Sequence, residues 1–117
     1  AVQYFCGELL MSDYGERIGG AGKKGEGFFG PLPNKQGGIS TELSVQFDGF
    51  NGGAPIPLLV PTLSGSDLNH ILSGGKPTQE MYQKALKHAA MRQNLGKSVW
   101  ADEGEIYPTP SGYIPVR

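Results

Sequence analysis

The chain has 117 residues, 19 of them glycine and 9 proline, so a single domain with much irregular structure is expected. Its formal net charge of −1 gives no general attraction to phosphate backbones or anionic lipid, and so indicates neither a nucleic-acid nor a membrane partner. The chain has no run of about 18 apolar residues, the length that a membrane-spanning helix needs.

The N-terminal stretch AVQYFCGELLM lacks the basic flank of a secretory signal, so we expect a protein made in a cytoplasm, with an initiator methionine removed before Ala1. Residues 1–11 are expected to form a short strand or a short helix, and periodicity does not decide between them. The single cysteine, Cys6, has no disulfide partner and no metal-ligand spacing, so we interpret it as a small buried hydrophobic residue.

Glycine dominates the next segment, where eight of the twenty residues from Gly19 to Gly38 are glycine and two are proline. This composition predicts an extended arm without a core of its own. We therefore divide the chain into an N-terminal segment and arm (1–38), a compact core (39–101) and an extended tail (102–117).

A strand signal begins the predicted core. From Ile39 to Asp48, polar residues at even positions alternate with residues at odd positions that are apolar except for Thr41. This alternation predicts a strand with one buried and one solvent-facing side. The set expected to be buried is Ile39, Thr41, Leu43, Val45 and Phe47. The stretch GFNGGA (49–54) then supplies a turn longer than the tightest hairpin loops.

The apolar stretch PIPLLVPT (55–62) contains three prolines, all at odd positions. Because successive N–H groups of a strand point to opposite edges, the missing donors fall on one edge, and even residues such as Ile56 and Leu58 can still pair. We interpret the stretch as an edge strand whose prolines block further pairing, with an extended loop as the alternative.

Two helices are predicted after these strands. Ser64 and Asp67 resemble a capping box at the start of a short helix, with Leu68, Ile71 and Leu72 on one face and Gly74-Gly75 at its end. Thr78 then caps a longer helix from about Gln79 to Leu95, followed by Gly96-Lys97. The face expected to be buried consists of Tyr82, Ala85, Leu86 and Ala89.

Beyond Val99 the chain is rich in acids, prolines and tyrosines. Trp100 is expected to fold back onto the core, and Tyr107–Arg117 to form a semi-rigid extended tail. The predicted fold is α+β: an antiparallel β-hairpin or small sheet packed against two helices, with extended arms rich in glycine and proline at both ends.

A basic stripe is the first candidate surface. Lys84, His88 and Arg92 recur every four residues on the second helix, and Lys87 lies beside them. Such a stripe can contact an acidic partner or a phosphate, but a solvated helix face explains it as well, because Glu80 and Lys84 already form an i, i+4 pair.

Several short motifs partly match known functional sites but lack required features. We therefore expect no catalytic, cofactor-binding or metal-binding residues. The GAGKKG stretch at 20–25 matches a dinucleotide fingerprint, but it has neither the preceding strand nor the following helix. His70 and His88 lack further zinc ligands. Asp102, Glu103 and Glu105 are interpreted as a solvated acidic linker.

Six short blocks occur in one order between Phe28 and Asp102: GFFGPL, STELSV, PLLVPTL, LSGGKPT, KALKHA and GKSVWA. In these blocks the chain resembles a small domain of tailed-bacteriophage proteins, found as a free-standing protein and within very large virion-associated polypeptides. The resemblance covers about two thirds of the chain and departs from the pattern at Gly49–Ala54. It implies a phage protein made in a bacterial host and located in the virion, and it transfers no catalytic residue.

From this resemblance and the predicted arms we expect a non-enzymatic virion protein, capsid-associated or a head–tail or internal component, that contacts other virion proteins in many copies. Exposed aromatic and apolar residues anchor such contacts. The candidates are Phe28, Phe29, Leu32, Tyr107, Tyr113 and Ile114, with packing onto the chain's own core as the alternative. A small phage regulator that binds a host protein or nucleic acid through the basic stripe is the second hypothesis.

Overall fold

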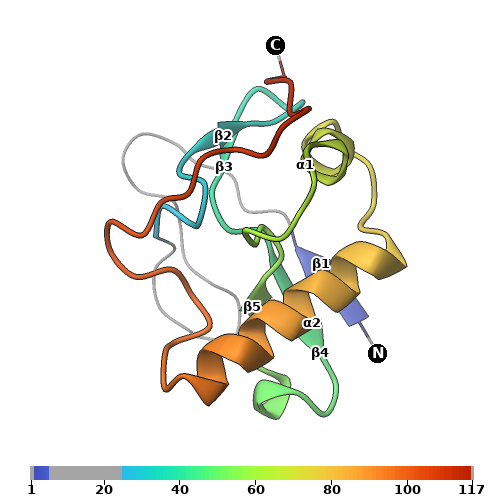
Figure 1. Ribbon diagram of the computed structural model, residues 1–117. Coiled ribbons are helices and arrows are strands. Elements are labelled where there is room, and N and C mark those ends of the chain that lie inside the picture. The colour runs from blue at the N-terminus through green and yellow to red at the C-terminus, as the bar shows by residue number, and fades with distance from the viewer. Residues whose placement is uncertain (1, 6–24, 117) are drawn as a thin grey trace.

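The computed structural model describes residues 2–5 and 25–116, and its fold is α+β, as predicted. Two small antiparallel sheets and two helices share one core (Figure 1). One sheet has the order β1-β4-β5 and the other pairs β2 with β3. The strands are β1 (Val2–Phe5), β2 (Leu32–Pro33), β3 (Ile39–Ser40), β4 (Ser44–Phe47) and β5 (Ile56–Pro57).

β1 answers the question that periodicity left open at the N-terminus. Val2 pairs with Phe47 and Phe5 with Ser44, so residues 2–5 add a strand to the edge of β4. Cys6 and all but the last residue of the GAGKKG stretch lie outside the described residues.

The predicted single strand from Ile39 to Phe47 is wrong, because the chain breaks into β3 and β4. Leu43 lies between them with φ 45°, a conformation that non-glycine residues rarely adopt. The break lets one segment serve two sheets, so that β3 pairs with β2 while β4 pairs with β1 and β5. Both sides of the segment are therefore covered. The residues at even positions, Ser40, Glu42 and Ser44, are buried instead of facing solvent.

The edge-strand interpretation of residues 55–62 is confirmed for the strand that forms, since β5 ends the sheet order. Leu58 N–H continues the pairing by donating to the Leu43 carbonyl at 2.7 Å. Pro55 and Pro57 are buried, however, so these prolines lie within the protein instead of guarding an open edge. The chain then turns away, with Leu63 N–H donating to the Val60 carbonyl.

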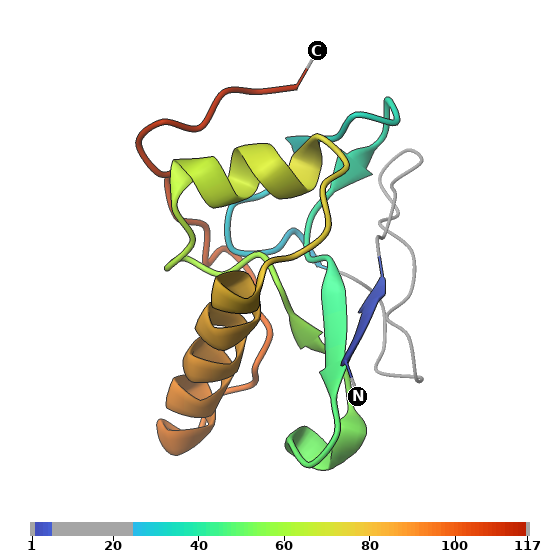
Figure 2. The same cartoon turned by 90° about the vertical axis from the view of Figure 1, so that its right-hand side faces the viewer.

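Both helices begin where their caps predict. Ser64 and Asp67 form the complete capping box of α1 (Gly65–Leu72), and Thr78 caps α2 (Gln79–Asn94) by accepting from Met81 N–H. Figure 2 shows α1 across the top of the molecule and α2 along one side of the three-stranded sheet. No helix in the described part of the chain is long and apolar enough to cross a membrane.

The buried face of α2 differs from the prediction. Ala85 and Ala89 are buried, but Tyr82 and Leu86 are only half-buried. The rest of the buried face consists of Met81, His88 and Arg92. The helix is thus rotated so that two residues of the predicted basic stripe point into the protein.

The core extends beyond residues 39–101. Phe28, Phe29 and Leu32 are buried in it, so the predicted arm is wrong from Gly27 onward. Trp100 packs against the core as expected. Between residues 102 and 116 the tail has no helix or strand, but Tyr113 and Val116 also pack against the core.

Gly27 allows the N-terminal segment to enter this core. Its φ is +77°, and a β-carbon there would overlap the Thr41 carbonyl. Gly37 has a similar φ of +85° but open space around its α-carbon.

We predict that Gly27→Ala lowers the free energy of unfolding by about 2–4 kcal/mol, because it adds a backbone clash to the left-handed strain. Gly37→Ala, the matched control, carries the strain alone and loses about 1 kcal/mol. Urea denaturation measures both. Equal losses in the two variants would show that Thr41 does not confine Gly27.

Candidate functional site

The buried guanidinium of Arg92 is the centre of the most connected polar cluster in the described residues. Its Nε donates to the Ser98 carbonyl at 2.5 Å and its Nη2 to the Trp100 carbonyl at 2.9 Å. Its Nη1 donates to Glu105 Oε2 at 2.8 Å, and the group lies 5.2 Å from the ring centre of Phe28. Arg92 is only 2% exposed, and each of its three side-chain nitrogens donates to a partner inside the protein.

The end of α2 makes this geometry possible. Gly96 has φ +74° just past the last helical turn, and Lys97 N–H donates to the Arg92 carbonyl at 2.9 Å. The chain therefore reverses at once. The carbonyls of Ser98 and Trp100 then face the helix that they follow, within reach of the guanidinium.

Glu105 completes the cluster. Its Oε1 accepts from Asp102 N–H at 2.9 Å, and its Oε2 accepts from Tyr107 Oη at 2.9 Å as well as from Arg92. Partial burial opposes ionisation, but the Asp102 amide, the Arg92 guanidinium and the Tyr107 hydroxyl together lower the pKa of Glu105 to about 2. Asp102 adds a longer ion pair of 3.7 Å to Arg92. The predicted solvated acidic linker is therefore wrong for Glu105, whereas Asp102 and Glu103 are exposed.

The predicted basic stripe is not a surface feature as a whole. Arg92 is buried, and His88 is buried edge-on against the Phe28 ring, with centroids 4.8 Å apart. Burial and the neighbouring Arg92 charge lower the pKa of His88, so its imidazole is neutral near pH 7. Its buried Nδ1 has no hydrogen-bond partner. Only Lys84 and Lys87 of the stripe reach solvent.

Lys84 links the two helices. Its Nζ lies 2.8 Å from Asp67 Oδ2 and 3.0 Å from Glu80 Oε1. Burial opposes ionisation of Asp67, but Lys84 and the Ser64 groups outweigh it and lower the Asp67 pKa. The Asp67 hydrogen bond raises the pKa of Lys84. The charge of Lys84 is therefore compensated within the chain.

The six candidate interface residues fall into three groups by burial. Phe28, Phe29 and Leu32 are buried, so the alternative of packing onto the chain's own core is correct for them. Tyr113 is half-buried. Tyr107 and Ile114 remain 40% and 71% exposed and keep the capacity to contact a neighbour.

Asn69 of α1 anchors the end of the tail. Its Nδ2 donates to the Gly112 carbonyl and its Oδ1 accepts from Ile114 N–H, each at 2.8 Å. Gly65 allows this approach, because a β-carbon there would meet the backbone of Ser111, Gly112 and Tyr113. Farther up the tail, Tyr107 N–H donates to the Phe28 carbonyl at 2.6 Å. The tail is thus attached to the rest of the protein at Tyr107 and again at Gly112 and Ile114, and Figure 2 shows its last residues passing over α1.

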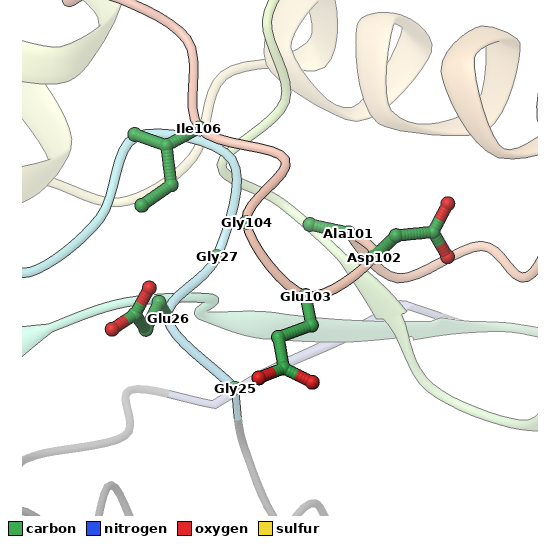
Figure 3. Close-up of a pocket in the computed structure, with 8 residues that line it drawn as sticks. All are labelled: Gly25, Glu26, Gly27, Ala101, Asp102, Glu103, Gly104 and Ile106. Carbon is green, nitrogen blue, oxygen red and sulfur yellow. The ribbon is translucent and has the colours of Figure 1, made fainter.

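A hollow of about 490 Å³ lies where the N-terminal segment meets the tail. Figure 3 shows the Glu103 carboxylate beside Gly25, the Glu26 carboxylate on the other side of the Gly25–Gly27 backbone, Asp102 turned away and Ile106 at the opposite end of the hollow. Sequence patterns do not indicate this hollow, because the residues that line it, 25–27 with 101–104 and 106, are far apart along the chain.

The described residues contain no group of three or more His, Cys, Asp or Glu side chains placed to hold a metal ion. His70 Nε2 lies 2.6 Å from the Lys76 carbonyl, where it ties α1 to the loop that follows. No protein-family model, curated protein or solved structure matches this chain.

The low pKa of Glu105 predicts a specific acid sensitivity. A carboxylate whose folded pKa is about 2, against an ordinary 4.5, contributes stability that is complete above about pH 4.5 and is lost as the pH falls toward 2. We expect Glu105→Gln to be less stable than the wild type at pH 7 and the difference to shrink between pH 4.5 and 2. Urea denaturation at a series of pH values tests this.

Glu103→Gln is the matched control, since its side chain is exposed in the same loop. At pH 7 it is expected to stay within about 0.5 kcal/mol of the wild type. A Glu105→Gln deficit that is the same at pH 7 and pH 2 would contradict the ion pair with Arg92.

Proposed function

We propose that this chain is a non-enzymatic structural protein of a bacteriophage virion, either capsid-associated or a head–tail or internal component, that acts through contacts with other virion proteins. The six blocks between Phe28 and Asp102 that resemble the phage domain support the origin. They include Phe28, Trp100 and the Ser98 carbonyl, which meet at or beside Arg92. The blocks therefore coincide with residues that determine this fold.

The single observation that carries the contact role is the exposure of Ile114. Its side chain is 71% exposed although its backbone is hydrogen-bonded to Asn69. An apolar side chain on an already ordered segment binds a neighbour at a smaller entropic cost than one on a flexible arm. The tail is thus suited to docking as a preformed surface, rather than by the folding-on-contact that a free arm would use.

The second hypothesis, a phage regulator that uses the basic stripe, is not favoured by any specific observation. It requires Lys84, Lys87, His88 and Arg92 to act together on one surface. Two of these residues are buried and the charge of Lys84 is compensated, so Lys87 alone would carry the attraction.

Quantitative mass spectrometry of purified virions of the encoding phage tests the proposal. We expect the chain at a fixed ratio to the major capsid protein if it lies on the shell, or at about a dozen copies or fewer at the portal, in the tail or inside the head. Its absence from purified particles would refute a virion role and direct the search to host partners.

Tail variants test whether Ile114 makes the contact. Ile114→Asp places a charge on the proposed surface and is expected to lower incorporation into virions about tenfold or more, without loss of folding. Thr109→Asp is the matched control, because Thr109 is also exposed on the tail. Normal incorporation of a folded Ile114→Asp chain would exclude this residue from the contact.

A further inference from the structure

The outer side of α2 carries a mixed basic and apolar surface. Lys84, Lys87, Met91 and Leu95 recur at intervals of three or four residues and so lie along one line of the helix, which we call the α2 stripe. Met91 is 46% and Leu95 64% exposed. Figures 1 and 2 agree that the sheet lies on one side of α2 and that no described element covers the other.

The α2 stripe is not flat. A hollow of about 280 Å³ opens on it, lined by Thr62, Lys84, Lys87, His88 and Met91. The neutral His88 is 93% buried at this position, and its Nδ1 is unpartnered. An apolar side chain can enter such a hollow without displacing a buried charge.

The net charge of the α2 stripe comes from Lys87. The ammonium of Lys84 is already bound to Asp67 and Glu80. Lys87 is exposed and has no carboxylate partner among residues 2–5 and 25–116. The stripe therefore offers one free positive charge beside exposed apolar side chains.

The hollow between the N-terminal segment and the tail offers the opposite features. Glu26 and Glu103 are exposed, with no cationic partner in the part of the chain that the structure describes, and the Glu103 carboxylate lies beside Gly25 (Figure 3). Ile106 forms an apolar wall and is 49% exposed. At about 490 Å³, the hollow has room for a lysine side chain.

We propose that copies of this chain associate head to tail, with the α2 stripe of one copy docked on the acidic hollow of the next. The Lys87 ammonium of one copy pairs with Glu103 of its neighbour, Glu26 adds negative charge to the same hollow, and Met91 and Leu95 cover Ile106. Complementary charge selects this partner, since α2 against α2 in a two-fold pair would bring lysines of like charge close together. This contact rests on the proposed virion role, in which the chain is present in many copies. A heterologous interface joins such copies into rings or filaments.

Charge reversal tests the pairing, with sedimentation velocity over a concentration series as the measurement. The wild-type chain is expected to form species larger than a monomer as its concentration rises. Lys87→Glu and Glu103→Lys are each expected to weaken association at least about tenfold, because like charges then face one another. Lys76→Glu, an exposed change of the same charge in the loop between the helices, is expected to leave association unchanged.

Mixing the two variants separates the pairing from a general loss of folding. In an equimolar mixture of Lys87→Glu and Glu103→Lys, the introduced carboxylate of one variant can pair with the introduced ammonium of the other, and the unchanged Lys87 can pair with the unchanged Glu103, so association is expected to return. The double variant Lys87→Glu/Glu103→Lys is expected to associate by itself. A wild-type chain that stays monomeric up to millimolar concentration, or variants that associate like the wild type, would overturn the contact.

The failure of this contact can be told apart from the failure of the virion role. A chain that is present in virions at a fixed ratio, but whose Lys87→Glu variant is incorporated normally, refutes the head-to-tail contact and leaves the virion role standing. A chain that associates as described but is absent from virions refutes the virion role and leaves the head-to-tail contact standing.

Discussion

The buried guanidinium of Arg92 is the constraint on which the rest of the structure depends. A charge this deep is costly unless its donors are matched, and here two backbone carbonyls and the Glu105 carboxylate meet them while Phe28 packs against the group. Those partners come from the turn after α2, from the start of the tail and from the N-terminal segment. One side chain thus joins three parts of the chain that form no common sheet.

This arrangement determines which surfaces are available for binding. Because Tyr107 N–H bonds to the Phe28 carbonyl and Asn69 holds the backbone at Ile114, the tail runs along the body as a fixed ridge with Ile114 outward. The same turn that satisfies Arg92 brings residues 101–106 against Gly25–Gly27 and forms the acidic hollow. The acidic hollow therefore follows from satisfying one buried charge, whereas Asn69 holds the tail at Ile114 independently.

Sequence reasoning succeeded where the signal is local. The caps Ser64 and Thr78, the capping acid Asp67 and the glycine at 96 lie within a few residues of the backbone that they stabilise, so α1 and α2 were predictable. It failed where partners are distant. Alternation from Ile39 could not reveal that β3 and β4 join different sheets, and a basic residue at 92 gave no sign that Glu105 and two carbonyls would enclose it. Asn69 was missed for the same reason.

The most direct test of this account is native-state hydrogen exchange and urea denaturation of Arg92→Lys. The variant keeps the positive charge but loses the planar fork that reaches Ser98, Trp100 and Glu105 together. The account predicts a loss of about 3 kcal/mol or more in the free energy of unfolding, together with faster exchange of the Tyr107 amide. Wild-type stability and wild-type exchange at Tyr107 in this variant would show that the guanidinium does not hold the tail to the core.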